Sequence, residues 1–187
     1  PPFGAKVEVD IEIAKRYELN SKAPEVLFIE ACYNFLKPGG KMAIVLPDGI
    51  LGNPNTEEVR LWILKHFKLI ASVDLPVETF LPQVGVQASL LFLQKKTDEE
   101  MLIPIESEDY DVFMAIVEQV GKDRRGVPVY ERDEDGAEIL FPHVKRWLAY
   151  NEFGREVVRS RNERIKRLAD DLPKVAEEYR KFRFDKL

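Results

Sequence analysis

The chain begins with Pro1, Pro2 and Phe3, three residues that together can hold a flat aromatic ligand. Each proline has a fixed backbone φ angle, so nearby carbonyl groups are held in place as hydrogen-bond acceptors for an exocyclic amine. The ring of Phe3 offers a face on which a nucleobase can stack. This order of residues favours the recognition of a base turned out of a duplex. The alternative is a plain loop, because two prolines cannot pair in the middle of a sheet.

Other common catalytic arrangements find little support in the sequence. Cys32 is the single cysteine and lies in the apolar helical pattern VLFIEACYNFLK, so we expect a buried hydrophobic side chain and no disulfide. His66 and His143 have no spacing typical of metal ligands, and we predict no metal site. The glycine pair Gly39-Gly40 follows a helical pattern and precedes a strand, which is the reverse of a dinucleotide-binding loop.

A doubly wound α/β sheet would position Pro1–Phe3, since ligands of such sheets bind beyond the carboxyl ends of the strands. Residues 1–98 predict such a sheet, with helices from Pro24 and from Asn55. The strands are expected near 41–46, 69–75 and 87–95. The first, KMAIVLP, is apolar throughout, which is typical of a strand covered on both faces and away from the sheet edge. No helix separates the last two, so we expect an antiparallel hairpin at one edge of a parallel sheet.

Two further regions follow the sheet. Residues 99–150 are turn-rich and are expected to extend the sheet domain, and within them residues 108–120 fit a helix or a strand. Residues 151–187 are expected to form a mostly helical tail, with a last short helix beginning near Asp171 and Pro173. Four apolar residues fall on one stripe of the expected tail helix: Val158, Ile165, Leu168 and Leu172.

The charge is distributed unevenly along the 187 residues. The chain carries a net charge of −5, but residues 155–187 hold 11 Lys/Arg and 7 Asp/Glu, so that this tail has a net charge of +4 and the remainder −9. Such asymmetry indicates a contact surface for a partner. The candidate contact residues are Arg155, Arg159, Arg161, Arg164, Lys166 and Arg167. No apolar run is long enough to span a membrane and no signal peptide is visible, which favours a cytoplasmic location; a targeting segment upstream of residue 1 would not be seen.

Several longer stretches occur in the order of known motifs. PPFG, FLKPGGKMAIVLPDGIL and VDLPVETFLPQVGVQASLLFLQKK resemble successive motifs of amino-directed DNA methyltransferases. More narrowly, they resemble the modification (M) subunit of type I restriction–modification systems, and DYDVFMAIVEQVGKDRRG and DDLPKVAEEYRKF resemble its downstream region. The resemblance implies that residues 1–98 are the C-terminal half of a Rossmann-like methyltransferase domain, and that the chain starts inside an Asn-Pro-Pro-Phe motif.

The resemblance also implies roles for single residues in methyl transfer from S-adenosylmethionine to adenine N6. Pro1 matches the proline whose carbonyl binds the adenine amino group, Pro2 its rigid partner, and Phe3 the aromatic that stacks on the flipped base. Phe80 matches a second aromatic on the other side of the base, although a core phenylalanine fits its position equally well. Asp48 follows a strand and is a candidate pocket residue, with a turn former as the alternative. The cofactor site and the catalytic Asn would lie upstream, so we expect this chain to be inactive alone.

The partners that the resemblance implies are double-stranded DNA with a flipped adenine, a DNA-specificity (S) subunit and a restriction (R) subunit. We expect the basic tail to contact the specificity subunit. A tail that folds back on the acidic body, or that contacts DNA phosphates, is an alternative. A second function is open at this point, namely a non-catalytic assembly module that holds the specificity subunit. A nucleotide-binding oxidoreductase is disfavoured because no Gly-x-Gly-x-x-Gly motif occurs.

Overall fold

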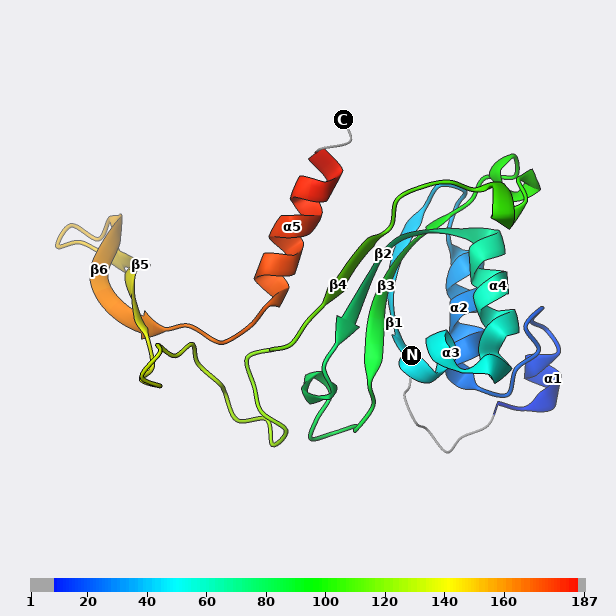
Figure 1. Cartoon of the computed structure of the whole chain (residues 1–187). Coiled ribbons are helices and arrows are strands. Elements are labelled where there is room, and N and C mark those ends of the chain that lie inside the picture. The colour runs from blue at the N-terminus through cyan, green and yellow to red at the C-terminus, as the bar shows by residue number, and fades with distance from the viewer. Residues whose placement is uncertain (1–8, 185–187) are drawn as a thin grey trace.

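A mixed four-stranded sheet forms the centre of the computed structural model, which describes residues 9–184 (Figure 1). Its strands are β1 (Lys41–Pro47), β2 (Phe67–Leu75), β3 (Ala88–Lys95) and β4 (Phe113–Ile116). The spatial order is β1-β3-β2-β4, with β3 antiparallel to both of its neighbours and β4 parallel to β2. The α/β class predicted from the sequence is confirmed, and the open question about residues 108–120 is answered by strand β4.

Helices cover both faces of this sheet (Figure 1). One face is covered by α2 (Pro24–Phe35) and α4 (Glu57–His66), with the short α1 (Ile11–Ala14) and α3 (Asp48–Gly52) on the same side. The last helix, α5 (Leu172–Phe184), lies against the other face. Four 3-10 turns complete the connections: Pro54–Thr56, Val77–Thr79, Glu100–Leu102 and Ile105–Ser107. Among residues 9–184, no helix has the length and apolar character that crossing a bilayer requires.

The larger core lies between the sheet and helices α2 and α4. Pro24 starts α2, where a missing N–H costs nothing, and the helix buries Val26 and Ile29. Helix α4 has Glu57 and Glu58 in its first turn and Lys65 and His66 in its last, an arrangement that favours the helix dipole. The residues that fill this core from the sheet and the helices are Val26, Ile29, Ile44, Leu46, Ile50, Trp62, Ile63, Phe67, Leu91 and Leu93.

A smaller core lies on the opposite face, under α5. Val73 and Leu75 of β2 and Val117 form its buried centre, and Val175 of α5 packs against them. Aromatic rings extend the contact, because Phe113 lies edge-on to Tyr179 and Phe182 of α5, with ring centroids 5.4 and 5.5 Å apart. The sheet is therefore buried on both faces, as its apolar strands predict.

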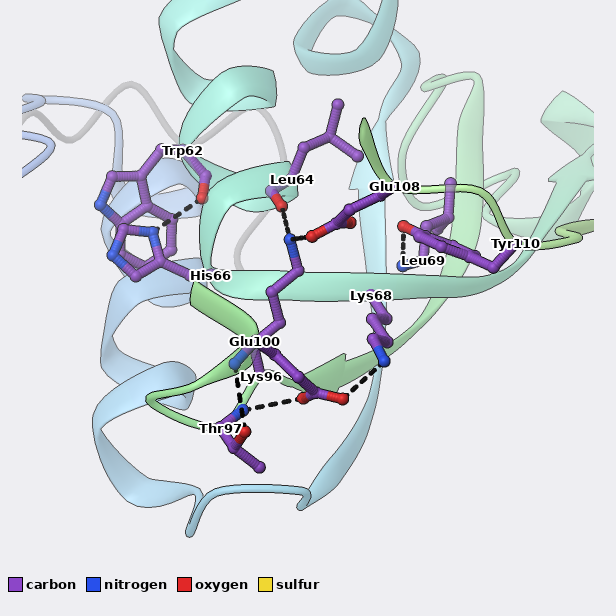
Figure 2. Close-up of polar contacts among 10 residues, drawn as sticks. All are labelled: Trp62, Leu64, His66, Lys68, Leu69, Lys96, Thr97, Glu100, Glu108 and Tyr110. Atoms are coloured by element: carbon purple, nitrogen blue, oxygen red, sulfur yellow. Dashed lines mark hydrogen bonds and ion pairs between the residues drawn. The ribbon is translucent and has the colours of Figure 1, made fainter. Parts of the chain in front are cut away.

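A buried ammonium group fastens the end of β3 to two other segments (Figure 2). Lys96 follows β3 and has only 1% of its surface exposed. Its Nζ donates to the backbone carbonyl of Leu64 in α4 at 2.6 Å and forms an ion pair with Glu108. Its backbone N–H donates to the carbonyl of His66. A charge buried this deeply is tolerated because both an anion and a carbonyl satisfy it.

The position of two strands differs from the prediction. The last two strands pair as the expected antiparallel hairpin, but the hairpin is not at the sheet edge, because β3 lies between β1 and β2. Within residues 9–184, β1 is itself an edge strand, contrary to the expectation for KMAIVLP. An apolar run indicates that both faces of a strand are covered. It does not indicate whether the strand has a hydrogen-bonded neighbour on each side. The expected antiparallel direction of β3 is confirmed.

The prediction of a mostly helical tail is wrong in its first half. Residues that were assigned to a helix form β6 (Glu156–Lys166), which pairs with β5 (Leu140–Tyr150) in an antiparallel hairpin. The misleading signal was the spacing of Val158 and Ile165, seven residues apart: this places them on one stripe of a helix but on opposite faces of a strand. Gly154, with a φ of +70°, supports the turn. The last predicted helix is confirmed as α5.

Removal of the Lys96 side chain tests its contribution to stability. Lys96→Ala leaves the Glu108 carboxylate and the Leu64 carbonyl without their buried partner, and we expect the free energy of unfolding to fall by about 3–5 kcal/mol. Lys96→Met with Glu108→Leu replaces the pair by apolar groups and should recover most of that loss. Lys68→Ala is the control, because its ion pair with Glu100 is about one-third exposed and contributes less than about 1 kcal/mol. Urea unfolding measures all three, and an unchanged midpoint for Lys96→Ala would contradict the account.

Candidate functional site

The carboxyl ends of the three parallel strands lie together at one end of the sheet, which we call its carboxyl edge. Because β1, β2 and β4 run in the same direction, their carboxyl ends meet there, at the lower end of the sheet in Figure 1. Pro47 at the end of β1 and Leu75 at the end of β2 both pair with Ala88, the first residue of β3. Ligands of open α/β sheets bind beyond this edge, which makes it the candidate site.

Asp48 lies at this edge and is held in place by β3. Its backbone N–H donates to the carbonyl of Gln87 at 3.0 Å, which continues the β1–β3 ladder by one residue. Its carboxylate accepts a hydrogen bond from the hydroxyl of Ser89 at 3.0 Å, and Ser89 is buried. Asp48 is therefore held by β3 at the strand end, and it is also the first residue of α3.

A second carboxylate lies next to this pair. Asp74 of β2 is the cross-strand partner of Ser89, and its Oδ1 accepts a hydrogen bond from Gln87 Nε2 at 3.2 Å. The same amide donates to the carbonyl of Leu75 at 2.7 Å. We call Asp48, Asp74, Gln87 and Ser89 the edge cluster. Sequence reasoning found only Asp48, although the polar residues at the ends of the apolar strands in VDLP and VQAS were a usable signal.

Phe80 lies in the loop between β2 and β3, on the other face of the sheet. It packs against Val73, Leu75 and Val117, whereas Asp48 reaches the row of Ser89 and Asp74 on the side of α2 and α4. The two predicted site residues thus share an edge but lie on opposite faces. Next to Phe80, the Thr79 hydroxyl is buried, and no residue in the described range 9–184 hydrogen bonds to it. The loop therefore contains, one residue before Phe80, a buried hydroxyl with no hydrogen-bond partner among the described residues.

Two basic residues hold the Phe80 loop from outside the sheet. Lys122 Nζ donates to the carbonyl of Leu81 at 3.0 Å, and Arg124 Nε lies 3.0 Å from the Glu78 carboxylate. The hydrogen bond from Arg124 lowers the pKa of Glu78 below its ordinary value. The segment after β4 therefore fixes the position of the loop that carries Phe80.

The remaining predicted residues of the base-binding site lie outside the described part of the chain. Pro1, Pro2 and Phe3 precede residue 9, so their place beside Asp48 and Phe80 stays a prediction. Residues 9–184 also contain no group of three or more His, Cys, Asp or Glu side chains arranged to hold a metal ion.

The described residues at this edge do not form a binding site for S-adenosylmethionine. The polar groups of the edge cluster hydrogen bond to one another. Gly39 and Gly40, the glycine pair of the sequence, lie at the start of β1 and exchange backbone hydrogen bonds with Lys95 at 2.9 and 2.8 Å. Their backbone groups are therefore hydrogen-bonded within the sheet, at the end of the strands opposite to the edge cluster.

The predicted basic contact residues divide into two groups. Lys166 pairs with Glu138 at 2.6 Å, Arg161 with Glu163 at 3.1 Å, and Arg167 with Glu131 at 3.9 Å. The hydrogen bond with Glu138 raises the pKa of Lys166 and lowers that of Glu138. In contrast, Arg155, Arg159 and Arg164 have no acidic partner among the residues that the structure describes. These three sit on the β5–β6 hairpin and its turn.

Truncation of Phe80 tests how far its ring packs in the small core. Phe80→Ala removes a partly buried ring from the small core and should lower the free energy of unfolding by about 2 kcal/mol. Phe80→Leu keeps most of the apolar contact and should cost less than half as much. Chemical unfolding measures both, and equal stability of the alanine variant and the unmodified protein would show that the ring does not pack as described.

The Glu78–Arg124 pair should make stability depend on pH. Because the folded-state pKa of Glu78 lies below the ordinary value of 4.5, the contribution is fully present above that pH and is lost as the pH falls through the folded-state value. Arg124→Gln should therefore lower the melting temperature at pH 7, and the difference should shrink progressively as the pH falls below 4.5. A difference that persists at low pH would assign the effect to something other than this carboxylate.

Comparison with known proteins finds a matching protein family and a curated relative. The sequence model of the N-6 DNA Methylase family matches residues 1–126. The type I restriction enzyme EcoEI methylase subunit of Escherichia coli is 31% identical over 96 residues, which are 51% of this chain and 20% of that subunit. The chain thus spans about a fifth of the length of this relative.

Two solved structures show the same kind of similarity. One is a modification subunit assigned to a type I restriction enzyme of Vibrio vulnificus YJ016, with 28% identity, a TM-score of 0.46, and coverage of 51% of this chain and 21% of that one. The other is the M protein of the type I restriction enzyme EcoKI, with 17% identity, a TM-score of 0.40, and coverage of 76% and 35%. The resemblance drawn from the sequence motifs is confirmed, and since the family match extends from PPFG past β4, the chain belongs to the N-6 DNA methylase family.

Proposed function

We propose that this chain supplies the base-recognition side of a DNA methyltransferase that modifies adenine N6 in a type I restriction–modification system. The observation that carries the proposal is the extent of the family match. Residues 1–126 include Pro1–Phe3, the edge cluster and the loop of Phe80 in one continuous match. The strand directions support it, because the edge cluster and the Phe80 loop lie at the carboxyl edge of the sheet, where ligands of this architecture bind.

The proposed role of the chain is to hold the extruded adenine. The carbonyl fixed by Pro1 and Pro2 accepts a hydrogen bond from the exocyclic amine, and Phe3 stacks on the ring. Phe80 closes the other side of the base from the β2–β3 loop. S-adenosylmethionine supplies the methyl group when it is bound. Direct transfer to the amine needs no covalent enzyme intermediate, so the proposal assigns no role to Cys32, which lies within α2.

We further propose that the chain works as part of a larger assembly. The relative that it matches is a subunit of a type I restriction enzyme and is about five times as long as the matched stretch. The residues that hold S-adenosylmethionine and the Asn that precedes Pro1 in the family motif would then belong to other parts of the polypeptide. Double-stranded DNA, a DNA-specificity subunit and a restriction subunit are the proposed partners, and the chain alone would be inactive.

The stacking role of Phe3 can be tested in the methyltransferase polypeptide that contains this chain, assembled with its specificity subunit. Base stacking on an aromatic side chain contributes about 1–3 kcal/mol, so Phe3→Ala should lower methyl transfer by roughly 5- to 150-fold. Binding of S-adenosylmethionine should stay unchanged, and Phe3→Tyr should keep most of the activity. The measurement is transfer of a radiolabelled methyl group to a duplex that contains the target adenine.

The matched control is Phe35→Ala, because Phe35 ends α2 and is 90% exposed, so that loss of its ring should not change transfer. Full activity of Phe3→Ala would contradict the assignment of Phe3. The absence of any methyl transfer to adenine by the unmodified assembly would contradict the proposed function itself.

A further inference from the structure

The β5–β6 hairpin is a two-stranded ribbon that stands apart from the sheet domain (Figure 1). Its strands pair from Leu140 with Lys166 to Tyr150 with Glu156, and most of its side chains are exposed on both faces. An isolated two-stranded ribbon is marginally stable in water, so exposure on both faces needs an explanation. Such a ribbon gains stabilising contacts when a binding partner covers both of its faces.

The charge of the ribbon is opposite to that of the rest of the protein. Residues 140–167 contain eight Lys/Arg and three Asp/Glu, a net charge of +5, whereas the remaining residues hold 20 Lys/Arg and 30 Asp/Glu, a net charge of −10. The ribbon is thus a projecting element with a net positive charge on an otherwise acidic chain. Such a concentration is the footprint of a polyanionic partner.

Several of these Lys and Arg side chains form no ion pair within residues 9–184. Lys166, Arg161 and Arg167 pair with nearby glutamates, as described above. Within residues 9–184, Lys145, Arg146, Arg159 and Arg164 have no ion pair with a carboxylate. The cross-strand register places Arg146 and Arg164 on one face, and Lys145 and Arg159 on the other. Unpaired charge therefore points to both sides of the ribbon.

The dimensions of the ribbon match a groove of duplex DNA. Two strands are about 5 Å apart, and eleven residues extend about 35 Å. The major groove is about 12 Å wide and admits a two-stranded ribbon, and one turn of the duplex is about 34–36 Å long. Phosphates line both walls of a groove, which fits the charges on both faces.

The base of the ribbon is connected to the candidate site. Glu131 N–H donates to the Arg167 carbonyl at 2.9 Å, and Tyr130 forms a β-bridge with Leu168, so the segment before the ribbon is fixed to the segment after it. The same segment binds the Phe80 loop through Lys122 and Arg124. The ribbon is therefore linked, through the segment that precedes it, to the loop that carries Phe80.

We propose that the β5–β6 hairpin lies along a groove of the duplex DNA whose adenine is modified, with its unpaired Lys and Arg side chains against the phosphates. This inference rests on the proposed function for the identity of the substrate. It takes up the DNA-phosphate alternative of the sequence analysis. The expected contact with a specificity subunit rested in part on a helical stripe, and residues 156–166 form a strand instead.

Salt dependence of DNA binding tests the proposal in the complete methyltransferase assembly. The variant Arg146→Gln, Arg159→Gln, Arg164→Gln removes three phosphate contacts, and all three side chains are exposed, so the fold should be unaffected. Each contact contributes about one to the slope of log affinity against log salt, and the slope should fall by about three. Affinity at about 0.1 M salt should fall on the order of 100-fold. Fluorescence anisotropy of a labelled duplex of about 30 base pairs measures both quantities.

The control variant carries Lys37→Gln, Lys41→Gln and Lys65→Gln, which removes three exposed charges from the body of the protein. Its slope should match that of the unmodified assembly. The proposal would be overturned if the variant with three Arg→Gln substitutions kept the original slope and affinity. It would also be overturned if that variant bound DNA normally but no longer co-purified with the specificity subunit. Methyl transfer to adenine by the unmodified assembly is measured in parallel. It reports on the proposed function independently of the slope, which reports on the hairpin alone.

Discussion

The buried ammonium group of Lys96 is the interaction on which the arrangement of the sheet depends. It joins the end of β3 to the last turn of α4 through the Leu64 carbonyl, and to the segment before β4 through Glu108. Since β4 follows Glu108 by a few residues, this pair sets where the outer strand begins. Neighbouring polar contacts reinforce the same region, for example the Tyr110 hydroxyl that accepts from the Leu69 N–H at 3.2 Å (Figure 2). A hydrophobic side chain at position 96 would pack there but would not specify these two partners.

This fixed end has its counterpart at the opposite edge, where function is proposed. The core strands are held at the Lys96 end, and their carboxyl ends carry short polar side chains that orient one another. The edge cluster keeps Asp48 and Asp74 close to β3, while the Phe80 loop is held by residues that come much later in the chain. The site is thus divided between a rigid part built on strands and a loop whose position depends on the segment leading to the hairpin.

Much of the sheet could be predicted from the sequence, because apolar runs and helix-start signals act locally. KMAIVLP and VQASLLFLQKK identify their strands, and the acidic first turn identifies α4. The order of the strands in the sheet could not be predicted from the sequence. The pattern of apolar residues along a strand indicates which of its faces are buried, but not which strands lie next to it. The hairpin was missed for a related reason. With both faces exposed, β6 has no apolar side that would reveal a period of two, and the spacing of Val158 and Ile165 imitates a helix. The polar cluster was found only in part because Gln87 and Ser89 belong to a loop–strand boundary with no distinctive motif.

The edge position of β1 has a consequence for handling the protein. Within the described range, β3 is the one strand that pairs with β1, so the other side of β1 presents a row of backbone N–H and C=O groups. Of its seven residues, Lys41 is charged and Pro47 lacks an N–H, but the five between them are apolar and extended. Natural sheets protect such edges with charges, prolines or a covering segment. A preparation of this chain by itself would therefore tend to self-associate through β1 as its concentration rises, and co-expression with a segment that pairs with β1 would keep it monodisperse.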